Sequence, residues 1–327
     1  MAQMFNRIAI VTIFIFTLIT IGCQTDQSEN STYLNTKHTE KLNVVATISM
    51  ITDIVENVGG NKINVTGIIG EGVDPHLYKP TARDTQRLKN ADIIFYNGLH
   101  LEVRITGSVL DKMKDKSKAI AVTDKVHKAQ LRPTPEFIGG YDPHVWHDAK
   151  IWMNATETVR DKLIEEDPKN AEHYHKNTKE YLKKLQNLHN DLLRLAAQIP
   201  LEKRVLITTH DAFGYLGKAY GFEVRGLIGV NTENEVGIAD VTDLASFIIN
   251  RGISTMFVET SAAPHGIKAV QAAVQAKGYN VKIGGSLYAD AMGTPGTSEG
   301  TYLGMMRYNI GTIANSLQTE LELAYSE

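Results

Sequence analysis

The sequence feature that most constrains the fold is the stretch from residue 169 to residue 198, which contains neither glycine nor proline. A helix of about 30 residues would span roughly 45 Å, longer than a small domain is wide. The segment therefore predicts a spine that joins two lobes. Its apolar side chains recur at helical spacing: Tyr181, Leu182, Leu185, Leu188, Leu192, Leu193 and Leu195.

Strand and helix patterns alternate on both sides of this spine. Short β-branched apolar runs are followed by helical segments, which predicts an α/β fold with two βα lobes, each containing a mainly parallel sheet. We therefore expect an N-terminal lobe at 42–168, a linking helix at 169–199 and a C-terminal lobe at 200–327. The expected strands are 42–48, 63–69, 92–96, 119–122, 205–209, 254–258 and 281–283, and the expected helices include 49–58, 81–90, 149–166, 240–249, 267–277 and 301–321.

The beginning of the chain has the pattern of an export signal. Arg7 precedes an apolar run at 8–21 that is too short for a stable membrane span, and Cys23, the only cysteine, follows it. We interpret 1–22 as a signal peptide and Cys23 as a lipidated N-terminus, with simple cleavage or a chance cysteine as alternatives. The polar segment 23–41 cannot bury enough apolar surface to fold and predicts a flexible tether.

Charge excludes one class of partner. The formal net charge is −3 and no block of basic residues is present. A nucleic-acid partner is therefore not expected, and a small ligand is favoured.

One tripeptide occurs twice, as Asp74-Pro75-His76 and Asp142-Pro143-His144. Proline fixes its own φ and pushes the preceding residue toward an extended conformation, so each histidine is expected on a stiff loop. Two imidazoles presented alike indicate one shared metal site. The alternative is an ordinary Asp-Pro turn that recurs by chance.

Two further groups strengthen the metal interpretation. We expect His210 and Asp290 to lie past the carboxyl ends of strands, as we expect of His76 and His144, and ligands of open α/β sheets bind outside those ends. Three imidazoles with one carboxylate suit zinc and other borderline divalent ions. Alternatives are a strand-end histidine bonded to a carbonyl and an aspartate that forms a turn. We expect His147 to support the ligands rather than join them, and three histidines of the spine to be solvated: His173, His175 and His189.

Five ordered motifs together resemble the zinc- and manganese-binding substrate-binding lipoproteins of bacterial ABC importers, the cluster A-I family of solute-binding proteins. They are Gly72 to His76, Asn97 to Glu102, Asp142 to Trp146, Thr209 to Tyr215, and Asp290 to Gly293 with Gly296 to Tyr302. The resemblance covers nearly all of the chain from Leu42 onward. It implies a metal between two βα lobes, with the family's ligands falling on His76, His144, His210 and Asp290.

The same resemblance implies a function. One Zn²⁺ or Mn²⁺ per chain would be bound outside the cytoplasm, by a monomer anchored to the membrane through Cys23, and delivered to a permease with its ATPase. The family usually has an apolar residue at the position of His147, which leaves that histidine's role open. The choice between zinc and manganese also stays open, because binding strength alone favours zinc at nearly any such site.

Two other functions remain as alternatives. A zinc hydrolase would need an open coordination position and a base, for which Glu259 or Asp211 could serve. A surface adhesin is the second alternative, although no partner-binding patch is visible in the sequence.

Overall fold

The computed structural model describes residues 41–136 and 139–324, with side chains placed as far as residue 317. The predicted signal peptide, Cys23 and nearly all of the predicted tether lie outside these residues. None of the described helices is long and apolar enough to cross a membrane.

The N-terminal half is built on a four-stranded sheet with the order β2-β1-β3-β4, in which every pairing is parallel. Val44 in the central strand pairs with Val65 on one side and Ile93 on the other. Because the strands are parallel, their carboxyl ends all lie at one edge of the sheet. The strands are β1 (Leu42–Ala46), β2 (Ile63–Gly67), β3 (Ile93–Tyr96) and β4 (Ala119–Ala121).

Helices follow the strands as the sequence predicts. Thr81 caps α2 in a capping box, since its hydroxyl accepts from the Asp84 N–H and the Asp84 carboxylate accepts from the Thr81 N–H. The α4 helix ends before Pro168, whose ring cannot continue it. The helices of this half are α1 (Ser49–Gly59), α2 (Ala82–Asn90), α3 (Val103–Ser108) and α4 (Ala149–Glu166).

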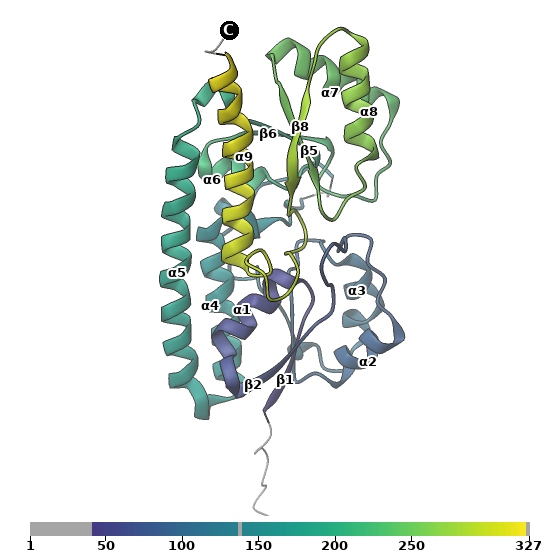
Figure 1. Ribbon diagram of the computed structural model, residues 1–327. Helices are drawn as coiled ribbons and strands as arrows, with labels where there is room; N and C mark the ends of the chain where they lie inside the picture. The colour runs from purple at the N-terminus through teal and green to yellow at the C-terminus, as the bar shows by residue number, and fades with distance from the viewer. Residues whose placement is uncertain (1–40, 137–138, 325–327) are drawn as a thin grey trace, which may run out of the picture. The chain divides into compact units, whose positions relative to one another are not determined.

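The predicted spine is α5 (Ala171–Ala197), which runs beside both halves of the described chain in Figure 1. It packs against α1, α4 and α9. Its buried stripe has a period of about 3.6 residues, and each large apolar side chain that it buries stabilises the fold by about 1.5–3 kcal/mol. The stripe consists of Tyr174, Thr178, Tyr181, Leu185, Leu188, Leu192 and Ala196.

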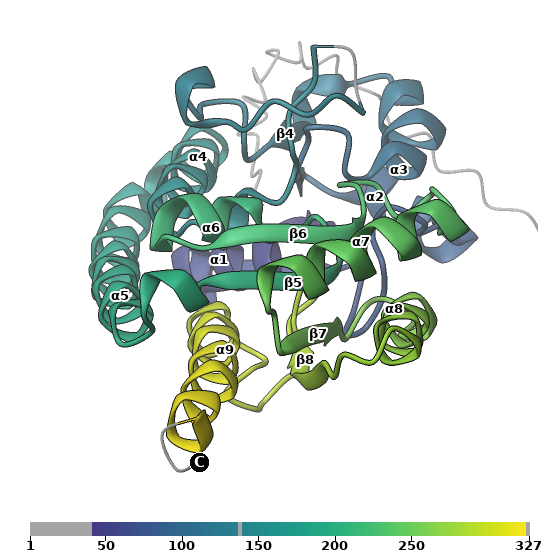
Figure 2. The same ribbon diagram turned by 90° about the horizontal axis from the view of Figure 1, so that it is seen from above.

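The C-terminal half contains two parallel strand pairs, β5-β6 and β7-β8. Figure 2 shows α8 and α9 on opposite sides of the β7-β8 pair. The strands are β5 (Val205–His210), β6 (Glu223–Ile228), β7 (Thr255–Glu259) and β8 (Lys282–Leu287). The helices are α6 (Gly214–Tyr220), α7 (Ile238–Arg251), α8 (His265–Ala276) and α9 (Tyr302–Ala324).

The α/β fold class is confirmed, but two elements were not predicted, α3 and β6. The β6 sequence Glu-Val-Arg-Gly-Leu-Ile is half polar and mostly not fully buried, so it lacks the apolar run that identified the other strands. The β8 strand also continues through Gly284 and Gly285, past the predicted end. A Cβ on Gly285 would lie 2.6 Å from Thr312 Cγ2, so this glycine allows α9 to pack closely on β8.

Candidate metal centre

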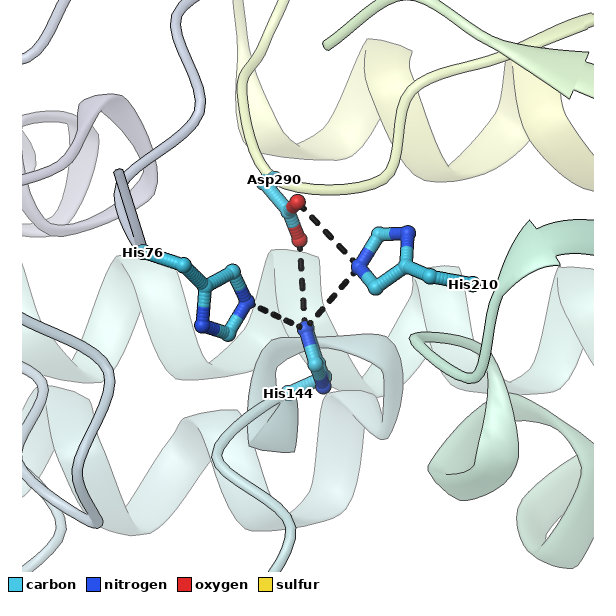
Figure 3. Close-up of side chains that lie close together, drawn as sticks. All are labelled: His76, His144, His210 and Asp290. Carbon is cyan, nitrogen blue, oxygen red and sulfur yellow. Dashed lines mark hydrogen bonds and ion pairs between the residues drawn. The ribbon is translucent and has the colours of Figure 1, made fainter. Parts of the chain in front are cut away.

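Four side chains from both halves of the chain converge at one point, as Figure 3 shows: His76, His144, His210 and Asp290. Each offers one nitrogen or oxygen atom, and these four atoms lie within 4.8 Å of one another. All four residues are buried, at no more than 2 % exposure. These are the four residues that the sequence singles out.

The topology explains most of this convergence. His76 lies in the loop after β2, His210 is the last residue of β5, and Asp290 lies three residues beyond β8. The carboxyl ends of the strands therefore face the site, as expected of an open α/β sheet. His144 is different, because a long loop separates it from β4.

The loop that carries His144 is joined to the sheet by hydrogen bonds. The Asn97 side-chain amide, directly after β3, donates to the Pro143 carbonyl over 3.0 Å. Asn97 is itself held by Glu102, whose buried carboxylate accepts from the Asn97 N–H at 2.7 Å and from the Thr47 hydroxyl at 2.6 Å. This network brings an irregular loop to the same edge as the strand ends.

The two Asp-Pro-His tripeptides form the same turn. Asp74 Oδ1 accepts from the His76 N–H at 2.8 Å, and Asp142 Oδ1 accepts from the His144 N–H at 2.9 Å. Each aspartate thus folds its side chain back onto the backbone two residues ahead. The recurrence in sequence is a recurrence in local structure.

Carboxylates fix the orientation of two imidazoles. His144 Nδ1 lies 2.8 Å from Asp142 Oδ1, and His210 Nδ1 lies 2.5 Å from Glu259 Oε2. Each Nδ1–H donates to its carboxylate, which leaves the Nε2 lone pair of the neutral ring directed into the site. The sequence analysis missed this role of Asp142 and Glu259, and in the case of Asp142 the Asp-Pro-His motif was the available signal.

The distances within the cluster match those of a small divalent ion's ligands. His144 Nε2 lies 3.2 Å from His76 Nε2 and 3.3 Å from His210 Nε2. Asp290 lies 3.3 Å from His144 Nε2 through Oδ1 and 3.2 Å from His210 Nε2 through Oδ2. Two nitrogens that each lie about 2.05 Å from a tetrahedral zinc ion would be about 3.3 Å apart. Lone pairs converge at this spacing at low cost only around a cation or a proton.

The electrostatics of the protein without metal follow from the same contacts. Burial lowers the pKa of His76 to about 3. Burial also opposes charge on His144, but hydrogen bonds to Asp142 and Asp290 outweigh it and raise its pKa to about 9. Burial is likewise outweighed at His210, where Glu259 and Asp290 hold the pKa above its ordinary value. At Asp290, burial is outweighed by the charges of His210 and His144, which hold the carboxyl pKa below its ordinary value. The site therefore stabilises positive charge.

A segment of the C-terminal half covers the His76 turn. The Thr232 hydroxyl donates to Asp74 Oδ2 at 2.7 Å, and Arg104 Nη2 lies 2.9 Å from Glu233 Oε1. Glu136 accepts from the backbone N–H groups of residues 230 and 231. We call residues 230–233 the strap. The strap joins the turn of one ligand, His76, to the other half of the chain.

His147 is buried beside the cluster but is not part of it. Its Nε2 lies 3.1 Å from the Ala289 carbonyl, which also accepts from Trp146 Nε1 at 2.9 Å. Its ring lies against Phe213, with centroids 4.5 Å apart. Trp146 and His147 thus both hold the Ala289 backbone, directly before Asp290. Burial lowers the pKa of His147 to about 3, so the ring is neutral.

The three histidines of the spine lie away from the cluster. His175 is exposed, as expected for the spine, but His173 and His189 are half-buried, so the expectation of full solvation is wrong for these two. His173 Nε2 lies 3.2 Å from the Gly59 carbonyl, and His189 Nδ1 lies 3.4 Å from the Tyr220 hydroxyl. These contacts join α5 to α1 and α6.

The two candidate general bases of a hydrolase are already engaged. Glu259 Oε1 accepts from the His210 N–H at 3.0 Å while Oε2 holds the His210 ring. Asp211 Oδ2 lies 3.5 Å from Arg132 Nη2. Glu259 is thus engaged through both of its oxygens, and Asp211 is engaged through Oδ2.

The fold and the cluster define a class of protein: an α/β protein of two halves that enclose a four-residue His/Asp site suited to one metal ion. The sequence profile of the family "Zinc-uptake complex component A periplasmic" matches residues 44–316. This chain belongs to that family.

Individual relatives agree with this assignment. The chain is 41 % identical to the manganese-binding lipoprotein MntA of Bacillus subtilis over 91 % of its length and 94 % of the relative. It is 43 % identical to the zinc-binding protein TroA of Treponema pallidum over 84 % of its length and 88 % of the relative. The solved structure of that periplasmic zinc-binding protein superposes with a TM-score of 0.82, covering 85 % of this chain and 99 % of the other.

A more distant structure shows the same fold with a different metal. The Mn-bound periplasmic metal-binding protein of Candidatus Liberibacter asiaticus is 28 % identical, with a TM-score of 0.74 over 85 % of this chain and all of the other. The family thus includes proteins named for zinc and proteins named for manganese.

Proposed function

We propose that this protein binds one Zn²⁺ or Mn²⁺ outside the cytoplasm and delivers it to the permease of an ABC importer. His76, His144 and His210 would donate Nε2 lone pairs, and Asp290 would supply the single anionic ligand. The observation that carries the proposal is the set of contacts of 3.2–3.3 Å among these four groups. Membership of the metal-uptake family supports it independently.

The lobes would act as the sequence analysis expects. We propose the division into an N-terminal lobe at 42–168, a linking helix at 169–199 and a C-terminal lobe at 200–327. Each lobe contributes two ligands, so the ion joins the lobes. Because the ligands are buried, release to a permease requires the lobes or the strap to move apart.

Anchoring through a lipid on Cys23 is also part of the proposal. The relatives named as lipoproteins support it, and a tether at 23–41 would leave the folded part free to turn toward its permease. Mass spectrometry of the membrane-bound protein tests this, because a diacylglyceryl group on Cys23 is expected and an unmodified N-terminus would exclude the anchor.

We infer that the bound metal is cargo and does not catalyse hydrolysis. Four protein ligands leave no open position at a tetrahedral ion, and a catalytic zinc needs one for water. The test is elemental analysis of protein purified without added metal, followed by competitive titration of zinc against manganese. One bound ion per chain and no turnover of ester or phosphoester substrates are expected. Turnover that depends on the metal would contradict the proposal.

A further inference from the structure

The amino ends of the N-terminal strands form a face opposite the metal site. Because the sheet is parallel, the ligand loops leave the carboxyl ends and all the strand starts lie at the other edge. In Figure 1 this is the end of the sheet at which β1 begins, farthest from the C-terminal half. Lys41 is the residue directly before β1, so the proposed tether joins the folded part at this face.

Lysines collect at the same face. Lys62 directly precedes β2, Lys118 directly precedes β4, and Lys89 lies at the end of α2 that leads into β3. The Lys118 ammonium donates to the Ala91 carbonyl over 3.2 Å, which ties the start of β4 to the approach to β3. Asp92, Asp111 and Asp115 lie in the same segments, but the lysines outnumber them, in a chain whose formal net charge is −3.

Part of this face is hollowed. A cavity of about 490 Å³ lies between α2 and the segment 108–118, with Lys89, Lys112, Lys114 and Lys118 among its lining. Val109 and Met113 add apolar surface, and Asp115 is the only acidic residue among the described residues that line it. The Asp115 carboxylate accepts from the Ser117 N–H and hydroxyl.

Four lysines of this face, including Lys116 in the segment just before β4, are available to a ligand. Their side chains are exposed, and within the described residues they form no ion pair. A negatively charged partner would therefore not have to displace an existing carboxylate. We call these four residues the lysine rim: Lys89, Lys112, Lys114 and Lys116.

We propose that the lysine rim is an electrostatic docking surface for the anionic phospholipid headgroups of the membrane to which the protein is tethered. A cluster of basic side chains near an anionic membrane surface adds electrostatic attraction to the hold of the proposed lipid anchor. Lys41, at which the proposed tether ends, and the rim lie at one face, so both can engage the bilayer together.

This docking would set the orientation of the metal site. The strand starts would face the bilayer, and the ligand cluster at the opposite edge would face the surrounding medium, where the cargo is. Delivery would then require the rim to leave the bilayer. The inference rests on the proposed lipid anchor for its biological setting, but the rim itself is tested without the lipid.

The test uses the processed chain from residue 23 with Cys23→Ser, so that no lipid is attached. Co-sedimentation with vesicles of phosphatidylglycerol and of phosphatidylcholine is measured at low and high salt. The rim variant is K89Q/K112Q/K114Q/K116Q. The matched control removes four exposed lysines elsewhere, K183Q/K184Q/K268Q/K282Q, and so makes the same change in net charge. Metal titration of each variant verifies the fold and tests the proposed function separately.

Binding to phosphatidylglycerol but not to phosphatidylcholine is expected, with loss at high salt because exposed charges are screened. The rim variant should bind at least about tenfold more weakly, and the control should bind like the parent. Equal binding to both lipids, or equal losses in the rim and control variants, would overturn the proposal. The proposal would also be overturned if millimolar glycerol phosphate displaced the protein from the vesicles as effectively as added phosphatidylglycerol. The cavity would then be a site for soluble phosphate esters.

Discussion

At the scale of single residues, two histidines three positions apart make different contacts. The Nε2 atom of His144 lies within 3.3 Å of a nitrogen or oxygen of each of the other three cluster residues, whereas His147 contacts the Ala289 carbonyl. His144→Ala should therefore weaken metal binding by well over the 10- to 100-fold typical of residues behind the ligands. His147→Ala should stay within that range. Calorimetric titration of both variants in one series measures the difference, and a larger loss for His147 would reverse the assignment.

The dependence of affinity on pH also belongs to this scale. The pKa of His144 is raised to about 9, so its ring carries an Nε2 proton at pH 7 before metal binds, and the pKa of His210 is shifted in the same direction. Metal must displace the Nε2 proton, because only an unprotonated Nε2 can be a ligand. Affinity should therefore rise as pH increases from 7 toward 9, and fall as pH drops. The proton displaced from His144 corresponds to a change of up to about tenfold per pH unit, and any proton displaced from His210 steepens it.

Metal titration in buffers of different ionisation enthalpy measures the released protons directly. At least one proton per ion is expected near neutral pH, from His144. His76 should contribute none, since burial lowers its pKa to about 3. Binding without proton release would contradict the assigned ligand set.

At the scale of elements, the strap connects a ligand to closure of the site. Thr232 donates to the same aspartate, Asp74, that orients the His76 backbone. Thr232→Val keeps the shape of the side chain and removes this hydrogen bond. The variant should release metal several-fold faster, since a hydrogen bond to a charged group contributes about 1.5–3 kcal/mol.

Stopped-flow mixing with a chelator measures this release rate. The matched control is Thr242→Val, which removes a helical hydroxyl contact to the Ile238 carbonyl in α7, away from the site. An unchanged rate for Thr232→Val would show that the strap does not hold the site closed. An equal increase in both variants would point to a general loosening of the C-terminal half.

The elements also show what sequence reasoning can reach. Buried strands such as β1 and β5 are apolar runs, and α5 has an uninterrupted apolar stripe, so both kinds of element were predicted. The expected positions of His76, His210 and Asp290 past the carboxyl ends of strands then predicted that these side chains lie together. The polar strand β6 has no such signal. The bond from Thr232 to Asp74 joins residues 158 positions apart, and local pattern contains no information about such a pair.

At the scale of the whole molecule, one ion between the two halves should stabilise the fold as a unit. An ion at 1,000 times its dissociation constant contributes about 4 kcal/mol to the free energy of unfolding. The melting temperature should therefore rise with metal concentration for both zinc and manganese. Calorimetric scans with and without metal measure this shift, and Asp290→Ala, which removes the only anionic ligand, should lose most of it.

The measurement that tests the central claim most directly is X-ray absorption spectroscopy at the zinc edge of protein loaded with one equivalent of zinc. It reports the identity and distance of the atoms around the ion. We predict three imidazole nitrogens at about 2.0–2.1 Å and at least one oxygen at about 2.0–2.2 Å. The imidazole signal should diminish in the His144→Ala protein and persist in the His147→Ala protein. A shell of oxygens with fewer than three imidazoles would contradict the account.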